Sequence, residues 1–127
     1  MTASRKHHEK LQGLGARLAF DYKDTNVVSS IVDVGGESGI PFILDCIGSQ
    51  ARSIAPIAKI AKSNAKVAIL LPVIVRDSTE TEDPEYGQDV QAAAQWAEGV
   101  DARGVRTHFY LDVSTTLISQ HWSQLTF

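Results

Sequence analysis

The sequence is poor in several features that define whole classes of protein. Its 127 residues include one cysteine, and aromatic residues make up 7% of the chain. A single cysteine cannot form an internal disulfide or a cysteine-based zinc cluster, so we expect a reducing, cytoplasmic setting. No N-terminal apolar segment resembles a signal peptide, and no apolar run approaches the ~20 residues of a membrane span. The formal net charge of −3 lacks the cationic excess that general nucleic-acid or membrane binding requires.

The chain does contain an alternation of helix-like and strand-like segments. The pattern predicts strands over residues 17–20, 41–47 and 66–71, the last of them closed by Pro72. It predicts a first helix over residues 5–14 and a second that begins at Thr25 or Asn26 and is broken by Gly35 and Gly36. A third helix would be capped by Ser53 and carry Pro56 in its first turn. The runs 41–47 and 66–71 are continuously apolar, which is typical of parallel strands buried on both faces. The alternation therefore predicts one α/β domain with an open parallel sheet.

The pattern changes after Pro72. Residues 76–89 are acidic and polar, which predicts a surface loop, and residues 88–98 have a weak helical pattern. Residues 105–111 predict one more strand, and residues 113–125 predict a terminal helix.

Two glycine clusters invite comparison with a phosphate-binding loop. They are Gly13-Leu14-Gly15 and the pair Gly35-Gly36 with Gly39. A pyrophosphate loop must follow a strand and open a helix, whereas both clusters follow predicted helices. We therefore interpret them as helix ends and loops, and the sequence contains no recognisable pyrophosphate loop.

The polar turn Ser4-Arg5-Lys6 precedes the first predicted helix. In a dinucleotide-binding fold the loop at this place meets the adenosine ribose, and an acid there selects NAD. This turn offers a hydroxyl and two cations instead, which suit a 2′-phosphate because charge-assisted hydrogen bonds to phosphate are strong. Tyr22 follows the next predicted strand, where its ring or hydroxyl would lie beside the adenine or the 2′-phosphate. The alternatives are a solvated helix start at the turn and an exposed edge tyrosine.

Other candidate chemistry is weaker. Asp45 and Cys46 end a predicted buried strand, where the carboxyl ends of parallel strands line a ligand crevice. A buried cysteine is more often a packing residue than a nucleophile. The neighbouring His7 and His8 would point about 100° apart on a helix and cannot hold one ion from the same face. We predict no metal site and assign no catalytic residue.

Six segments occur together in a recognisable order: residues 2–6, 14–16, 20–24, 45–49, 68–72 and 105–111. This ordered set resembles the cofactor-binding Rossmann domain of medium-chain dehydrogenases/reductases. It is most similar to the fungal, zinc-free, trans-acting enoyl reductases that partner polyketide synthases, and to quinone-reductase-like proteins. The resemblance covers about residues 2–111. It implies that residues 1–111 form an incomplete NADP-binding, Rossmann-like domain of three αβα layers with a mostly parallel sheet. Residues 112–127 would be a divergent C-terminal tail.

The resemblance implies an NADPH site. It matches Ser4 and Lys6 to contacts with the adenosine 2′-phosphate, adds Tyr22 to them, and includes Arg5 in the same turn. The other implied cofactor contacts lie at strand ends: Cys46, Ile47 and Gly48 beside the ribose and adenine, Leu71 and Pro72 near the nicotinamide ribose, and Phe109, Tyr110 and Leu111 beside the nicotinamide. In the family, hydride passes from NADPH to the β-carbon of an activated double bond without zinc.

The chain also departs from that family. We find no GroES-like catalytic domain, no first Rossmann strand and no glycine-rich turn in it. We therefore expect a truncated NADPH-dependent enoyl reductase that is inactive alone and whose cofactor binding is weak or lost. The alternative function is a non-catalytic module that pairs with a full-length reductase or a polyketide synthase. Such pairing would use the sheet edge that a missing strand leaves open.

Overall fold

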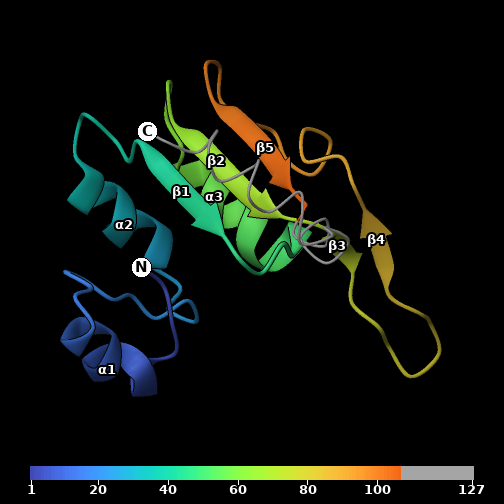
Figure 1. The fold of residues 1–127 in the computed structure, drawn as a ribbon, viewed down its shortest axis with the longest axis horizontal. Helices are drawn as coiled ribbons and strands as arrows, with labels where there is room; N and C mark the ends of the chain where they lie inside the picture. Colours follow the sequence, from blue (N-terminus) through green and yellow to red (C-terminus); the bar gives the residue numbers. More distant parts are fainter. Residues whose placement is uncertain (107–127) are drawn as a thin grey trace, which may run out of the picture.

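The computed structural model describes residues 1–106. The helical elements are η1 (Arg5–His7), α1 (His8–Gly13), α2 (Val27–Gly35), the π-helical turn η2 (Gln50–Ile54) and α3 (Ala55–Ile60). The strands are β1 (Phe42–Asp45), β2 (Lys66–Leu70), β3 (Val73–Arg76), β4 (Glu85–Gly87) and β5 (Asp101–Val105). Figure 1 shows how these elements are arranged. Within the described residues, no helix has the length and apolar character needed to cross a membrane.

A parallel sheet of β1, β2 and β5 forms the centre of the molecule, with β2 in the middle (Figure 1). The register aligns Phe42 with Lys66, and Lys66 with Asp101. Parallel neighbours need a crossover connection, and η2 with α3 supplies the one between β1 and β2. The predicted α/β class with a mostly parallel sheet is therefore confirmed for this part of the chain.

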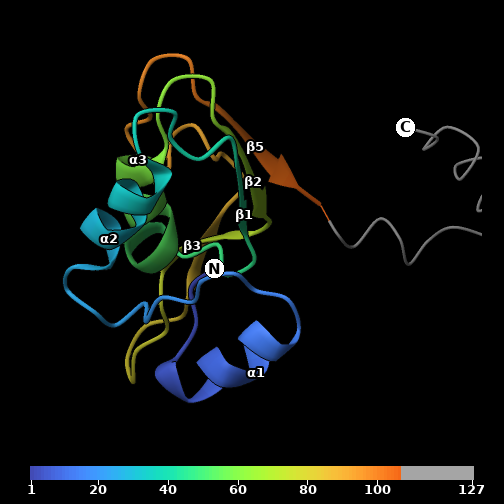
Figure 2. The ribbon, with the colours of Figure 1, turned by 90° about the vertical axis from the view of Figure 1, so that its left-hand side faces the viewer.

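One face of this sheet carries the hydrophobic core. The helices α2 and α3 both lie on that side of the sheet (Figure 2). Val67 and Ile69 point into the core and are 2% and 0% exposed. The other buried members of the cluster are Ile54, Ala61, Ala65, Val73, Val90, Ala93 and Ala102. Because side chains alternate along a strand, every second residue of β2 joins this core.

The opposite face is bare within residues 1–106. Phe42 and Leu44, on β1, are 72% and 65% exposed. The prediction that the strand of residues 41–47 is buried on both faces is therefore wrong for the described chain. No helix among the described residues lies over this face (Figure 2), so a continuous apolar run here has only one covered side. The described residues supply two of the three predicted layers.

The N-terminal part follows the predicted pattern except at its first strand. Residues 5–14 are helical in η1 and α1, and α2 begins directly after Asn26, although the Asn26 side chain makes no capping hydrogen bond. Both glycine clusters follow helices, as expected. The predicted strand over residues 17–20 is wrong, because Phe20 forms only an isolated parallel bridge to Thr2. A lone bridge cannot extend without a neighbouring strand to pair with.

The helix after β1 begins earlier than predicted. Ser49, not Ser53, is its N-terminal cap, and its hydroxyl accepts a hydrogen bond from the Arg52 N–H at 3.3 Å. The Ser53 hydroxyl instead donates to Asp45 at 2.7 Å. Pro56 lies in the first turn of α3, where its missing N–H costs little.

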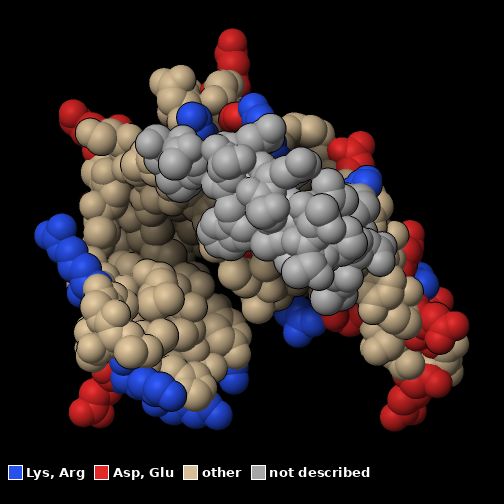
Figure 3. Space-filling view, in the orientation of Figure 1, with Lys and Arg blue, Asp and Glu red and all other residues tan. Residues whose placement is uncertain are grey.

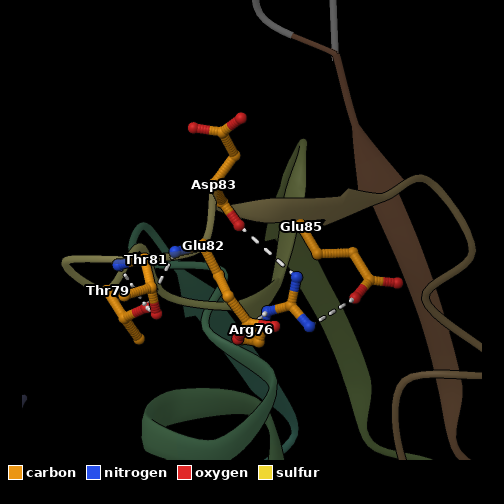
Figure 4. Close-up of polar contacts among 6 residues, drawn as sticks. All are labelled: Arg76, Thr79, Thr81, Glu82, Asp83 and Glu85. Atoms are coloured by element: carbon orange, nitrogen blue, oxygen red, sulfur yellow. Dashed lines mark hydrogen bonds and ion pairs between the residues drawn. The ribbon is translucent and has the colours of Figure 1, made fainter.

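The acidic segment 76–89 is a loop only in part. Its residues Glu85–Gly87 form β4, which pairs antiparallel with β3 in a separate two-stranded sheet. Arg76 lies between Glu82 of the connecting loop and Glu85 of β4, with its guanidinium 3.8 Å from the Glu82 carboxylate and 3.9 Å from that of Glu85 (Figure 4). It also donates to the Asp83 carbonyl at 3.5 Å. The hairpin was missed because an acidic, proline-containing run gives no β pattern.

The last described segment differs from its prediction. Residues 88–98 form turns rather than a helix. The next strand begins at Asp101, and Val105 is its last residue rather than its first. The predicted strand continuation over 107–111 and the predicted helix over 113–125 lie outside the described residues.

Candidate functional site

The predicted 2′-phosphate residues come together at the N-terminus. Thr2 and Phe20 form a parallel bridge, and the Ala3 N–H donates to the Phe20 carbonyl at 2.9 Å. Ser4 and Tyr22 each lie two residues beyond this bridge and therefore meet. The Ser4 hydroxyl donates to the Tyr22 hydroxyl at 3.3 Å. Two residues 18 positions apart thus present neighbouring hydroxyls.

Three cations are sequence neighbours of these two hydroxyls. Arg5 and Lys6 follow Ser4 directly and are exposed in η1. The Lys23 ammonium lies 5.8 Å from the centre of the Tyr22 ring. Lys and Arg side chains gather over the α1 end of the molecule (Figure 3). We call Ser4, Arg5, Lys6, Tyr22 and Lys23 the N-terminal cluster. Hydroxyls and cations are the kinds of group that proteins in general use to bind phosphate monoesters.

A hydrogen bond of His8 also helps to hold this turn in place. The His8 Nε2 hydrogen-bonds the Ala3 carbonyl at 2.9 Å, which ties α1 to the segment before Ser4. Sequence reasoning weighed His8 only as a metal ligand. Among residues 1–106, no group of three or more metal-ligating side chains could hold an ion.

The predicted strand-end residues also lie near one another. The Ile74 N–H donates to the Gly48 carbonyl at 2.7 Å, and Ser49 forms a parallel bridge with Ile74. Gly48 has φ +68°, and a Cβ there would lie 2.9 Å from the Leu70 carbonyl oxygen and 3.1 Å from that of Pro72. The loops after β1 and β2, which carry the residues assigned to the cofactor, are therefore in contact.

The side chains at the end of β1 have different surroundings. Cys46 and Ile47 are exposed, so Cys46 is not the buried packing cysteine that the strand pattern suggested. Asp45 is 4% exposed; its carboxylate accepts from the Ile47 N–H at 2.9 Å and from the Ser53 hydroxyl at 2.7 Å. Both carboxylate oxygens have partners, so Asp45 holds the loop in shape.

Leu71 and Pro72 follow β2 directly, and the Leu71 N–H donates to the Val105 carbonyl at 2.9 Å. This bond fixes the start of the loop against β5. Phe109, Tyr110 and Leu111, the predicted nicotinamide contacts, lie outside the described residues.

A hollow of about 500 Å³ lies over the bare face of the sheet. Its floor is apolar, and its charged rim is formed by Lys66, Asp101 and Arg103. The Arg103 guanidinium donates to the Asp101 carboxylate at 2.8 Å, and this hydrogen bond lowers the pKa of that carboxyl. The Lys66 ammonium lies 6.0 Å from the centre of the Phe42 ring. Sequence reasoning missed this hollow because it expected both faces of the sheet to be covered.

Comparison with known proteins gives partial matches. No protein-family model matches the chain. The chain is 56% identical over 39 residues to the trans-enoyl reductase tazE of Aspergillus terreus. This matched stretch covers 31% of the chain and 13% of tazE. The chain is 32% identical over 72 residues to the dual trans-enoyl reductase/FAD-dependent monooxygenase tazHJ of the same fungus. This second stretch covers 57% of the chain and 10% of tazHJ.

A third match extends over more of the chain. It is 27% identical over 100 residues to the uncharacterized protein YNL134C of Saccharomyces cerevisiae, which covers 78% of the chain and 26% of that protein. The matched stretches thus span between 10% and 26% of these relatives' lengths. The chain is similar in part to trans-enoyl reductases, which supports a broad relationship to enoyl-reductase-like oxidoreductases.

Proposed function

We propose that this chain is the cofactor-binding part of an NADPH-dependent, enoyl-reductase-like oxidoreductase of the medium-chain type. The observation that carries the proposal is the hydrogen bond between Ser4 and Tyr22, which gathers a hydroxyl pair beside Arg5 and Lys6. The similarity to trans-enoyl reductases supports it independently. In the whole enzyme, bound NADPH would supply hydride to an activated carbon–carbon double bond.

The described residues fit one end of NADPH better than the other. The Tyr22 hydroxyl would donate its own proton to an oxygen of the adenosine 2′-phosphate, and the Ser4 hydroxyl would turn its proton from Tyr22 to the phosphate on binding. Arg5 and Lys6 would offset the charge of the phosphate. NAD carries a neutral hydroxyl at that position, and two nearby cations would add little to its binding free energy. The glycine clusters within residues 1–106 follow helices, so they offer no glycine-rich turn for the pyrophosphate. We therefore propose weak binding through the 2′-phosphate and no turnover by this chain alone.

Two nucleotides that differ only in the 2′-phosphate test this proposal. We expect 2′,5′-ADP to bind about tenfold more tightly than 5′-AMP in calorimetric titrations, a difference of about 1.4 kcal/mol. Lys6→Met should weaken 2′,5′-ADP binding about fivefold and leave 5′-AMP unchanged, whereas Lys59→Met, which removes the same charge from α3, should change neither. Equal affinities for the two nucleotides, or no binding of 2′,5′-ADP at about millimolar concentration, would reject NADPH recognition.

A non-catalytic interaction module is the second candidate. The exposure of Phe42 and Leu44 favours it, because parallel sheets are nearly always covered on both faces. Within the described residues, β1 also pairs with a strand on one side only, and an unpaired apolar edge favours strand addition. The partner would be a full-length reductase or a polyketide synthase.

Light scattering and pull-down with such purified partners test the interaction module. Specific binding that Leu44→Asp abolishes, without loss of the chain's own fold, would support it. A monomer that binds neither partner would reject it. The NADPH proposal does not depend on this outcome, because the N-terminal cluster does not include the bare face of the sheet.

A further inference from the structure

Lys23 belongs to the N-terminal cluster, although the resemblance that includes residues 20–24 assigns it no role. It follows Tyr22 directly, and its ammonium lies 5.8 Å from the centre of the Tyr22 ring. The hydroxyl of the same ring accepts the hydrogen bond from Ser4. A cation near an aromatic face is attracted by the negative potential over the ring. The Lys23 side chain therefore has a reason to stay beside the ring whose hydroxyl would meet a phosphate.

The backbone of Lys23 is held by its neighbours while its charge stays available. The Lys23 N–H donates to the Asp21 carboxylate at 3.0 Å, and the Asp24 N–H donates to the Asp21 carbonyl at 3.0 Å. The Asp24 carboxylate in turn accepts from the Asn26 N–H at 2.9 Å. Both acids beside Lys23 thus accept from backbone amides. Across residues 1–106, no carboxylate lies within 4.0 Å of the Lys23 ammonium.

We infer that Lys23 is a specificity-determining residue of the 2′-phosphate site. This inference rests on the proposed NADPH function. A phosphate held by the Ser4 and Tyr22 hydroxyls would have Lys6 on the turn side and Lys23 on the ring side. The four-carbon stem of lysine lets its ammonium move from the ring face to a phosphate oxygen. Lys23 would then favour a doubly charged phosphate monoester over the neutral ribose hydroxyl of NAD.

The test compares 2′,5′-ADP with 5′-AMP in Lys23→Met, Lys23→Arg and Lys59→Met variants. An exposed charge pair is worth up to about 1 kcal/mol, so Lys23→Met should weaken 2′,5′-ADP binding about three- to fivefold. Its affinity for 5′-AMP should stay unchanged, because that nucleotide lacks the 2′-phosphate. Lys23→Arg should retain affinity within about twofold, and Lys59→Met should show no loss. Thermal unfolding identical to that of the wild type would confirm that the variants are folded.

The possible outcomes separate this inference from the function on which it rests. If Lys6→Met weakens 2′,5′-ADP binding but Lys23→Met does not, the role of Lys23 is wrong and NADPH recognition stands. If Lys23→Met weakens both nucleotides equally, Lys23 supports the Tyr22 ring rather than the phosphate, and the inference is again wrong. If the wild type does not distinguish the two nucleotides, the inference and the NADPH proposal both fail.

Discussion

The two faces of the parallel sheet differ sharply although they share the same strands. On the α3 side, Val67 and Ile69 are 2% and 0% exposed. On the other side, Phe42 and Leu44 leave 72% and 65% of their surface exposed. Phe42 and Leu44 are as apolar as Val67 and Ile69, so the character of these side chains does not explain their different exposure, although the bare face also carries the charged residues Lys66, Asp101 and Arg103. A strand's apolar residues stabilise the fold only where another element covers them, because the hydrophobic gain scales with the area removed from water.

The largest effect is expected from truncating the covered face. Ile69→Ala removes a fully buried side chain from between the sheet and its helices, and such changes cost about 2–5 kcal/mol. We expect a loss of about 3 kcal/mol in the free energy of unfolding, measured by urea denaturation. A loss below about 1 kcal/mol would show that the cavity collapses or that the core is packed differently.

Truncation of the bare face should have a much smaller effect. Leu44→Ala removes a side chain that is already 65% exposed, so we expect a change within about 0.5 kcal/mol in the same assay. Leu44→Ala and Ile69→Ala both replace a branched aliphatic side chain with a methyl group, but the two side chains lie on opposite faces of the sheet. A loss comparable to that of Ile69→Ala would contradict the comparison and show that this face is covered in solution.

The smallest effect concerns the charged rim of the bare face. Hydrogen bonding from Arg103 lowers the pKa of Asp101, and the charges of Arg103 and Lys66 act in the same direction. A carboxyl whose folded pKa lies below its unfolded value contributes stability above that unfolded value, and loses it as pH falls through the folded pKa. Both side chains are exposed, so solvent screens the pair and the change in stability should be minor.

Arg103→Met should therefore raise the pKa of Asp101 toward its ordinary value of 3.8, as followed by NMR titration of the carboxyl. Arg52→Met, which breaks the separate pair with Asp77, is the matched control and should leave Asp101 unchanged. An unaltered Asp101 titration in Arg103→Met would mean that the pair does not persist in solution.

The elements that were predicted well are those with a local cause. The helix over 5–14, the start of α2 after Asn26 and the strand at 66–70 were all visible in hydrophobic spacing and in turn residues. The failures at residues 17–20 and at β4 depended on distant partners, whereas the helix cap at Ser49 and the turns over 88–98 are local features that the pattern also missed. Among residues 1–106, Phe20 bridges Thr2 and no other residue, and β4 exists because β3 pairs with it.

The members of the candidate site stay predictions, to which the structure adds one contact between Ser4 and Tyr22. Ser4, Arg5, Lys6 and Tyr22 were chosen from residue type and from the resemblance, and the Ser4–Tyr22 contact agrees with that choice. Lys23 lies in the matched segment 20–24, but neither its residue type nor the resemblance assigned it a role. Its relevance appears only in the distance from its ammonium to the ring, which no spacing rule provides.

Residue pattern alone was sufficient for the α/β class and for the hydroxyls and cations of the opening turn, since periodicity and side-chain chemistry are local properties. Tertiary structure decided which strand face is covered and that residues 18 positions apart share a hydrogen bond. Those outcomes depend on where α2, α3 and the Thr2–Phe20 bridge come to lie. Burial and pairing are relations between distant segments, and a strand carries the same sequence whether or not a helix covers it.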